Sequence, residues 1–181
     1  MNRKIAILRG INVGGKRKIL MADLKAMFGK MKFSNVKTYI QSGNVFFDLT
    51  KEIDNSELAQ KIEKAIKKEF GFDVPVIVRT PKEIETIINQ NPFYNKDTDI
   101  IHLHLTFLNE EPTAENQEKT GLYDYEPDKF EIKGKDVFIY CKGKYHQCKL
   151  TNNFFEKKLK VNATTRNWKT VLKLQELSKQ D

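Results

Sequence analysis

The chain has 181 residues, of which 39% are hydrophobic and 31% charged, and its formal net charge at pH 7 is +8. Such a length provides one sizeable core or two small ones, and the composition excludes a disordered or fibrous protein. No apolar run approaches the ~18 residues that span a bilayer. The N-terminus has no signal-peptide pattern, and Cys141 and Cys148 make no disulfide framework. We therefore predict a cytoplasmic globular protein without a membrane partner.

The first half of the chain predicts the element order β-α-β-β-α-β. Apolar and β-branched runs indicate strands, and apolar residues spaced three and four apart indicate helices. Pro75 favours an edge position for the last strand of this half. Together the elements predict a ferredoxin-like subdomain over residues 1–80. Strands are expected at about 4–8, 36–40, 45–49 and 74–78, and helices at about 20–32 and 54–70.

The second half predicts a partial echo of the first. A helix begins after Thr80, where Pro81 and Glu83 complete a good N-terminal signal, and it ends near Asn91. We expect a second α+β subdomain over residues 81–181, with a helix in place of its last strand and extra C-terminal helices. One compact domain overall is the alternative. The remaining elements are a strand at 101–107, a short helix at 113–120, a hairpin around 130–139 and helices at about 152–159 and 165–178.

The segment after the first strand reads RGINVGGKRK over residues 9–18. From Gly10 it matches the phosphate-binding loop pattern G-x-x-x-x-G-K, but Arg17 stands where a metal-binding Ser or Thr is required. No later strand supplies the acidic residue that would hold the metal, and the helix begins too late. A nucleoside triphosphatase is therefore not expected. Two interpretations remain open: a looser anion site, or a simple turn that needs its glycines.

Topology predicts a partner for this loop. The first two strands run parallel because the helix between them is a crossover, so residues 10–18 and residues 41–44 should lie at the same end of the sheet. Charge supports an anion there, since residues 9–37 carry eight basic side chains against Asp23 alone. The candidate ligand-binding residues at this end are Arg9, Asn12, Gly14, Gly15, Lys16, Arg17, Ser42 and Asn44.

Arg166 is the ninth candidate. The sequence places it in the first turn of the last helix, where a cation opposes the helix dipole and no acidic residue offsets it. An anion bound at the helix start would reverse that penalty. Alternatively, Arg166 points away and pairs with an acid elsewhere. Trp168, two residues later, is expected in the core.

Other site chemistry has weaker support. His102, His104, His146 and Cys148 offer zinc ligands in principle, but their spacing matches no known motif, and we predict neither a metal nor a cofactor. No histidine lies near the basic loop, which leaves it poorly equipped for acid–base catalysis. An RNA-recognition module needs displayed aromatics, and only one of Phe46 and Phe47 can be displayed.

Three stretches resemble the bacterial family called domain of unknown function 1697. They read LRGINVGGK (8–16), TYIQSGNV (38–45) and ATTRNWKTVLKL (163–174), and together they span most of the chain. One departure is Leu20 before Met21, where the family often has proline. The resemblance implies a small cytoplasmic α+β protein with two subdomains, and it implies no reaction or ligand.

The leading functional prediction is a protein that binds an anionic small ligand, such as a phosphate-bearing metabolite or a nucleotide, at the basic glycine-containing loop. One alternative is a nucleic-acid-binding protein that uses the basic N-terminal segment. A second alternative is an enzyme of unknown reaction on an anionic substrate. Neither a reaction nor an oligomeric state is predicted.

Overall fold

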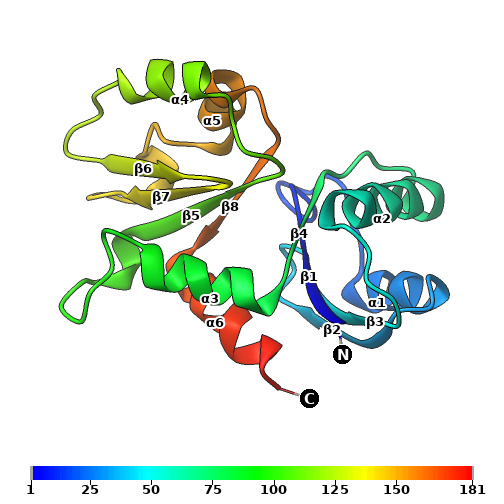
Figure 1. Cartoon of the computed structure of the whole chain (residues 1–181). Coiled ribbons are helices and arrows are strands. Elements are labelled where there is room, and N and C mark those ends of the chain that lie inside the picture. The colour runs from blue at the N-terminus through cyan, green and yellow to red at the C-terminus, as the bar shows by residue number, and fades with distance from the viewer. Residues whose placement is uncertain (1, 181) are drawn as a thin grey trace. The chain divides into compact units, whose positions relative to one another are not determined.

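The computed structural model describes residues 2–180 and divides into two compact units (Figure 1). The first unit extends to Ile84 and includes the chain from Leu177, and the second comprises Glu85–Glu176. Each unit contains a four-stranded antiparallel sheet, which confirms the predicted α+β class. Among the described residues, no helix has the length and apolar character needed to cross a membrane.

The first unit has the predicted β-α-β-β-α-β order. Its sheet has the order β2-β3-β1-β4, in which β1 pairs antiparallel with both β3 and β4, and β2 pairs antiparallel with β3. Strands β1 and β2 therefore run parallel, and β4, which follows Pro75, lies at an edge as predicted. The elements are β1 (Asn2–Leu8), α1 (Met21–Lys30), β2 (Ser34–Tyr39), β3 (Asn44–Leu49), α2 (Asn55–Phe70) and β4 (Val76–Arg79).

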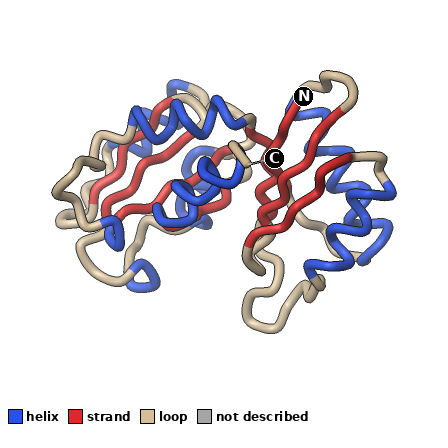
Figure 2. The backbone as a smooth tube through the Cα atoms, turned by 90° about the horizontal axis from the view of Figure 1, so that it is seen from below, coloured by secondary structure: helices blue, strands red, loops and turns tan. Residues whose placement is uncertain are grey.

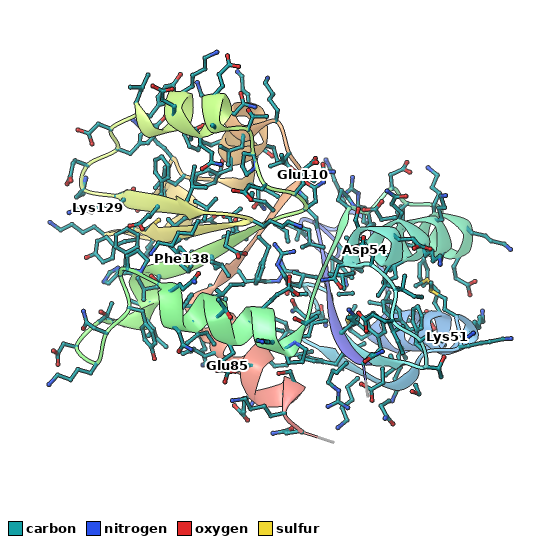
Figure 3. The ribbon with its side chains drawn as sticks, viewed as in Figure 1. Lys51, Asp54, Glu85, Glu110, Lys129 and Phe138 are labelled. Carbon is teal, nitrogen blue, oxygen red and sulfur yellow. The ribbon has the colours of Figure 1, made fainter. Side chains whose placement is uncertain are left out.

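Helices α1 and α2 cover one face of this sheet (Figure 2). Leu24 and Phe28 of α1 and Ile62 of α2 are fully buried against alternate residues of the strands. Asp54 lies at the start of α2 (Figure 3), where its carboxylate accepts hydrogen bonds from the Ser56 and Glu57 amides. These local signals agree with the sequence because capping and apolar periodicity act within a few residues.

The second unit repeats the same order from β5 onward. Its sheet order, β6-β7-β5-β8, corresponds strand for strand to that of the first unit. The expected helix in place of the last strand is wrong, because Ala163–Asn167 forms strand β8 and pairs with β5. The remaining elements of the chain, of which α3 and α6 each extend into the first unit, are α3 (Pro81–Gln90), η1 (Ile100–His102), β5 (Leu103–Leu108), α4 (Ala114–Gly121), β6 (Lys129–Lys133), β7 (Asp136–Tyr140), η2 (Tyr145–Gln147), α5 (Asn152–Leu159), β8 and α6 (Trp168–Ser178).

Helices α4 and α5 cover one face of the second sheet (Figure 1), and Phe155 and Leu159 of α5 pack into the core there. Helices α3 and α6 are joined by a hydrogen bond from Gln175 Nε2 to Glu85 Oε1 of 3.3 Å. Trp168 begins α6 and is fully buried, which confirms its predicted core role. The sequence did not predict strand β8 because ATTRN contains a single apolar residue and therefore shows no alternation of apolar and polar side chains.

Candidate functional site

Two connections lie at the same end of the first sheet, as the topology predicted: residues 9–20 between β1 and α1, and residues 40–43 between β2 and β3. Ile7 pairs with Asn44, and the Leu8 amide donates to the Gly43 carbonyl at 2.8 Å. We call this region the loop–hairpin end.

Asn12 joins the two connections. Its Nδ2 donates to the carbonyls of Ile19 at 2.9 Å and Gln41 at 3.0 Å, and its Oδ1 accepts from the Ile19 amide at 2.9 Å. Its backbone has a φ of 56°, a conformation that asparagine tolerates better than most residues. Because both polar atoms of the side-chain amide are already used, Asn12 holds the loop in place rather than offering its amide to a ligand.

Gly43 brings the hairpin against the loop. A Cβ at this position would lie 2.7 Å from Ile11 Cδ1 and 2.8 Å from Leu8 Cβ, and the φ of 79° also favours glycine. Asn44 is buried beside it, and its Nδ2 donates to the Tyr39 carbonyl at 3.1 Å and to Ser42 Oγ at 3.3 Å. The amide of Asn44 therefore closes the hairpin.

The glycines of the motif form the tip of the loop. Gly14 and Gly15 both have positive φ, 57° and 74°, and Val13 and Lys16 pair on either side through a hydrogen bond of 3.1 Å from the Lys16 amide to the Val13 carbonyl. This is the φ pattern of a two-residue hairpin turn of type I′. The turn alone accounts for the two glycines.

The tip presents cations to solvent. Lys16 and Lys18 are exposed, whereas Arg17 is half-buried, and its guanidinium Nη1 lies 3.4 Å from where a Cβ on Gly10 would be. Arg9 is also half-buried, and its amide donates to the Pro75 carbonyl at 2.9 Å. The same end exposes large apolar side chains: Val13 (63% exposed), Leu20 (72%) and Ile40 (43%).

Arg166 differs from its predicted setting. It lies in β8, paired with Leu105, and not in the first turn of a helix, because α6 begins at Trp168. Its Nη1 donates to Thr164 Oγ1 and to the Thr165 carbonyl, both at 3.0 Å. Burial lowers the pKa of Arg166 to about 10, so the group stays cationic at neutral pH. The helix-dipole argument for Arg166 is therefore wrong.

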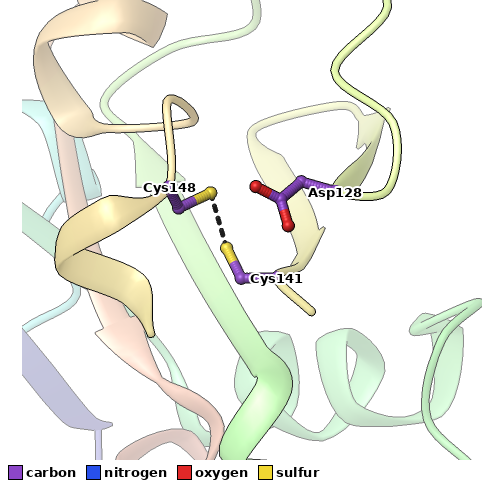
Figure 4. Close-up of side chains that lie close together, drawn as sticks. All are labelled: Asp128, Cys141 and Cys148. Carbon is purple, nitrogen blue, oxygen red and sulfur yellow. Dashed lines mark hydrogen bonds between the residues drawn. The ribbon is translucent and has the colours of Figure 1, made fainter. Parts of the chain in front are cut away.

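The sulfur and histidine ligands considered for zinc are arranged differently from the expected set. Asp128, Cys141 and Cys148 bring one ligand atom each within 4.8 Å of one another, without a histidine (Figure 4). Cys141 Sγ and Cys148 Sγ are 2.6 Å apart, and Asp128 Oδ1 accepts from the Lys142 amide at 2.9 Å. His104 instead stacks on Tyr145, with ring centroids 4.2 Å apart.

Burial raises the pKa of both Cys141 and Cys148, and each thiol is further affected by the other. The two thiols hydrogen-bond each other, and a metal ion would have to displace a proton from each sulfur before it could bind there. We therefore assign the pair a packing role in the core of the second unit, where both residues lie among the buried apolar side chains.

The fold defines a class before any relative is considered: an α+β protein made of two β-α-β-β-α-β units, with a braced basic loop at one end of the first sheet. The chain belongs to the family Protein of unknown function (DUF1697), whose model matches residues 1–138. No curated protein matches the chain.

A solved structure described as that of a conserved bacterial protein from Streptococcus pneumoniae is similar to this chain. The two share 23% sequence identity and a TM-score of 0.76, and the match covers 98% of this chain and 99% of the other. This similarity supports the fold over nearly the whole chain.

Sequence reasoning missed the role of Asn12 as a brace. A signal was present in the order of the residues, because an asparagine between a buried Ile11 and a glycine turn is a common site for side-chain hydrogen bonds to nearby backbone. The bond to Gln41, 29 positions away, carried no sequence signal.

Proposed function

We propose that this protein binds a phosphate-bearing small ligand, such as a metabolite or a nucleotide, at the loop–hairpin end of its first unit. The observation that carries the proposal is the Asn12 brace, which fixes the loop to the hairpin while Lys16 and Lys18 stay exposed and Arg17 half-exposed. A loop already held in place loses less conformational entropy when a ligand binds.

The roles of the candidate residues follow from their contacts. Lys16, Arg17 and Lys18 attract the anion, and Ser42 on the adjoining hairpin offers a hydroxyl. Asn12 and Asn44 act as positioning residues, because their side-chain amides bond to backbone. Gly14 and Gly15 form the turn that orients Lys16. Contacts from Arg9 and Arg166 to the ligand remain predictions.

Calorimetric titration of the full chain with inorganic phosphate, and then with adenosine monophosphate, tests the proposal. We expect binding that weakens about tenfold in a Lys16→Gln/Arg17→Gln variant, because two charge-assisted contacts are lost. A Lys64→Gln/Lys68→Gln variant removes two exposed lysines of α2 and controls for net charge. Equal affinity in the two variants, or no binding of either ligand, would sink the proposal.

Binding of single-stranded nucleic acid is a second candidate, and one observation favours it. Val13, Leu20 and Ile40 are exposed beside the basic tip, and a nucleic-acid strand presents both phosphates and apolar base faces. Fluorescence anisotropy with a labelled oligonucleotide at several salt concentrations separates the candidates. A single-stranded polyanion gives a steep dependence of affinity on salt, with a log–log slope of about −0.7 per phosphate neutralised, whereas a mononucleotide gives a shallow one.

An enzymatic reaction on the bound anion is the remaining alternative. It would need a proton donor or acceptor at the tip, and the three histidines of the chain lie at positions 102, 104 and 146 in the second unit. We therefore rank binding first and propose no cofactor. Release of inorganic phosphate from a bound nucleotide in a discontinuous assay would overturn that ranking.

A cytoplasmic setting, where such ligands are abundant, is part of the proposal.

A further inference from the structure

A second candidate site lies entirely within the second unit. A pocket of about 680 Å³ opens between η1, the β7–η2 connection and the start of α6. That volume falls in the range of roughly 300–1,000 Å³ typical of small-molecule sites. None of its lining residues belongs to the loop–hairpin end, so the pocket stands independently of the function proposed above.

The inner wall of the pocket contains His104, which is only 6% exposed. Its ring stacks on that of Tyr145 at an interplanar angle of 18°. Among the described residues, no hydrogen bond reaches His104 Nδ1. Burial lowers the pKa of His104, an effect that the backbone of His102 partly opposes, so the ring is neutral at pH 7. A buried polar atom without a partner costs free energy, and a ligand that supplies the partner recovers it.

The rim of the pocket is cationic and partly apolar. Lys142, Lys144 and Lys169 line it and are exposed, against one carboxylate, Asp99, whose Oδ1 accepts from the Ile101 amide at 3.1 Å. The Ile101 side chain is 69% exposed and adds apolar surface to the same rim. Three cations beside exposed apolar surface are complementary to a ligand that has both an anionic group and an apolar body.

We propose that this pocket binds a small molecule in which a flat apolar ring carries one anionic group. The ring covers Ile101 and lies toward the stacked His104 and Tyr145 side chains. The anionic group lies among Lys142, Lys144 and Lys169, and a polar atom of the ligand meets His104 Nδ1. Each part of the ligand is thus matched by a described feature of the pocket.

The first test uses 1-anilinonaphthalene-8-sulfonate, a flat apolar anion whose fluorescence rises on binding, with the full chain in its native state. N-phenyl-1-naphthylamine, which lacks the sulfonate, is the neutral probe. We expect saturable binding of the anion, weakened about tenfold by Lys144→Gln/Lys169→Gln, because two ion pairs are lost. Ile101→Glu changes an exposed side chain and should weaken binding at least as much. The control, Lys82→Gln/Lys157→Gln, removes two exposed lysines outside the pocket and should bind as the wild type does.

The second test identifies the anionic group and the role of His104. Phenyl phosphate and benzoate compete with the bound probe, and the stronger competitor shows whether the site prefers a phosphate monoester or a carboxylate. His104→Phe keeps a ring against Tyr145 but removes the ring nitrogens, so we expect competition to weaken about fivefold while binding of the neutral probe is unchanged. Thermal melting verifies that each variant is folded.

Equal affinity for the anionic and the neutral probe would overturn the proposal. So would unchanged affinity for the anionic probe in the Lys144→Gln/Lys169→Gln and Ile101→Glu variants. Failure of both phenyl phosphate and benzoate to displace the bound probe would overturn it as well. Competition unaffected by His104→Phe would remove His104 from the site.

Discussion

Asn12 Nδ2 donates a hydrogen bond to the Gln41 carbonyl at 3.0 Å, although the two residues are 29 positions apart in the chain. The same nitrogen donates to the Ile19 carbonyl, and the side-chain oxygen accepts from the Ile19 amide. One side chain thereby closes its own loop and fastens that loop to the neighbouring hairpin. The position of Lys16, Arg17 and Lys18 depends on this arrangement.

Replacement of Asn12 by alanine should therefore affect both stability and binding. Loss of three hydrogen bonds, which leaves the amide and the carbonyl of the buried Ile19 without these partners, is expected to cost about 1–3 kcal/mol in the free energy of unfolding. Phosphate affinity should fall as well, although the proposal assigns the Asn12 amide a positioning role and no contact with the ligand. Urea denaturation and calorimetry measure the two effects. Asn89→Ala, at an exposed position of α3, is the control and should change neither. Unchanged phosphate affinity in Asn12→Ala would show that the brace has no part in binding.

Gly43→Ala and Gly14→Ala form a second matched pair. Both glycines have positive φ, so each substitution has a backbone cost of about 1 kcal/mol. At Gly43 the new methyl would also meet Ile11 and Leu8 below 3 Å, whereas nothing lies within 4 Å at Gly14. We expect Gly43→Ala to lower the unfolding free energy by at least about 2 kcal/mol more than Gly14→Ala, because buried backbone has to shift. Equal losses would mean that the hairpin moves away from the loop freely.

Local signals made most of the fold predictable. Asp54 and Thr80 cap α2 and α3 from the residue before each helix, where the sequence indicated. The Thr80 hydroxyl and the Glu83 carboxylate form the expected reciprocal cap, in which the Thr80 amide donates to Glu83 Oε2 at 2.7 Å. Strand β8 was not predictable, because Thr164 and Arg166 are buried by pairing with β5 and not by an apolar pattern of their own. Only tertiary context makes that segment a strand.

The internal repeat explains Arg166 better than the helix dipole does. Arg79 is the last residue of β4 and pairs with Ile5 of β1. Arg166 lies near the end of β8 and pairs with Leu105 of β5. Both arginines are buried, and each is followed by the polar residue that caps the next helix. The sequence repeat is too weak to see directly, since the shared pattern is one arginine and one polar residue. The proximity of the two loops, by contrast, followed from topology alone.

Asp48 provides a prediction about acid stability. Arg3 donates to it from Nε at 2.9 Å and Nη2 at 3.2 Å, and Asn35 Nδ2 donates at 2.7 Å. The hydrogen bond from Arg3 lowers the pKa of Asp48 below its ordinary 3.8. The unfolded chain therefore takes up the proton first, so the stabilisation is complete above pH 4 and is lost as pH falls through the lower, folded value.

Asp48→Asn should cost about 3 kcal/mol at pH 7, because Arg3 keeps its charge in a largely buried position. The variant should also lose part of the decline in stability below pH 4. Asp73→Asn breaks the exposed pair with Lys67 and should change stability by no more than about 0.5 kcal/mol. Denaturation at several pH values distinguishes these results, and a cost at Asp48 as small as that at Asp73 would contradict the assigned role.

The thiol pair gives the last prediction, which concerns alkaline pH. Burial raises the pKa of Cys141 and Cys148 above the ordinary value of 9.0, so the folded protein retains both thiol protons where the unfolded chain releases them. The unfolded state then binds fewer protons, and the free energy of unfolding should fall between pH 9 and 10, by up to about 1.4 kcal/mol per pH unit for each thiol. A Cys141→Ala/Cys148→Ala variant should lack this decline, whatever its stability at pH 7.

The same protonation predicts slow labelling by dithiobisnitrobenzoate at pH 7.5 in the native protein and rapid labelling of both thiols in urea. Rapid labelling without urea would mean that the pair is accessible and ionised, and the packing role assigned to it would be wrong.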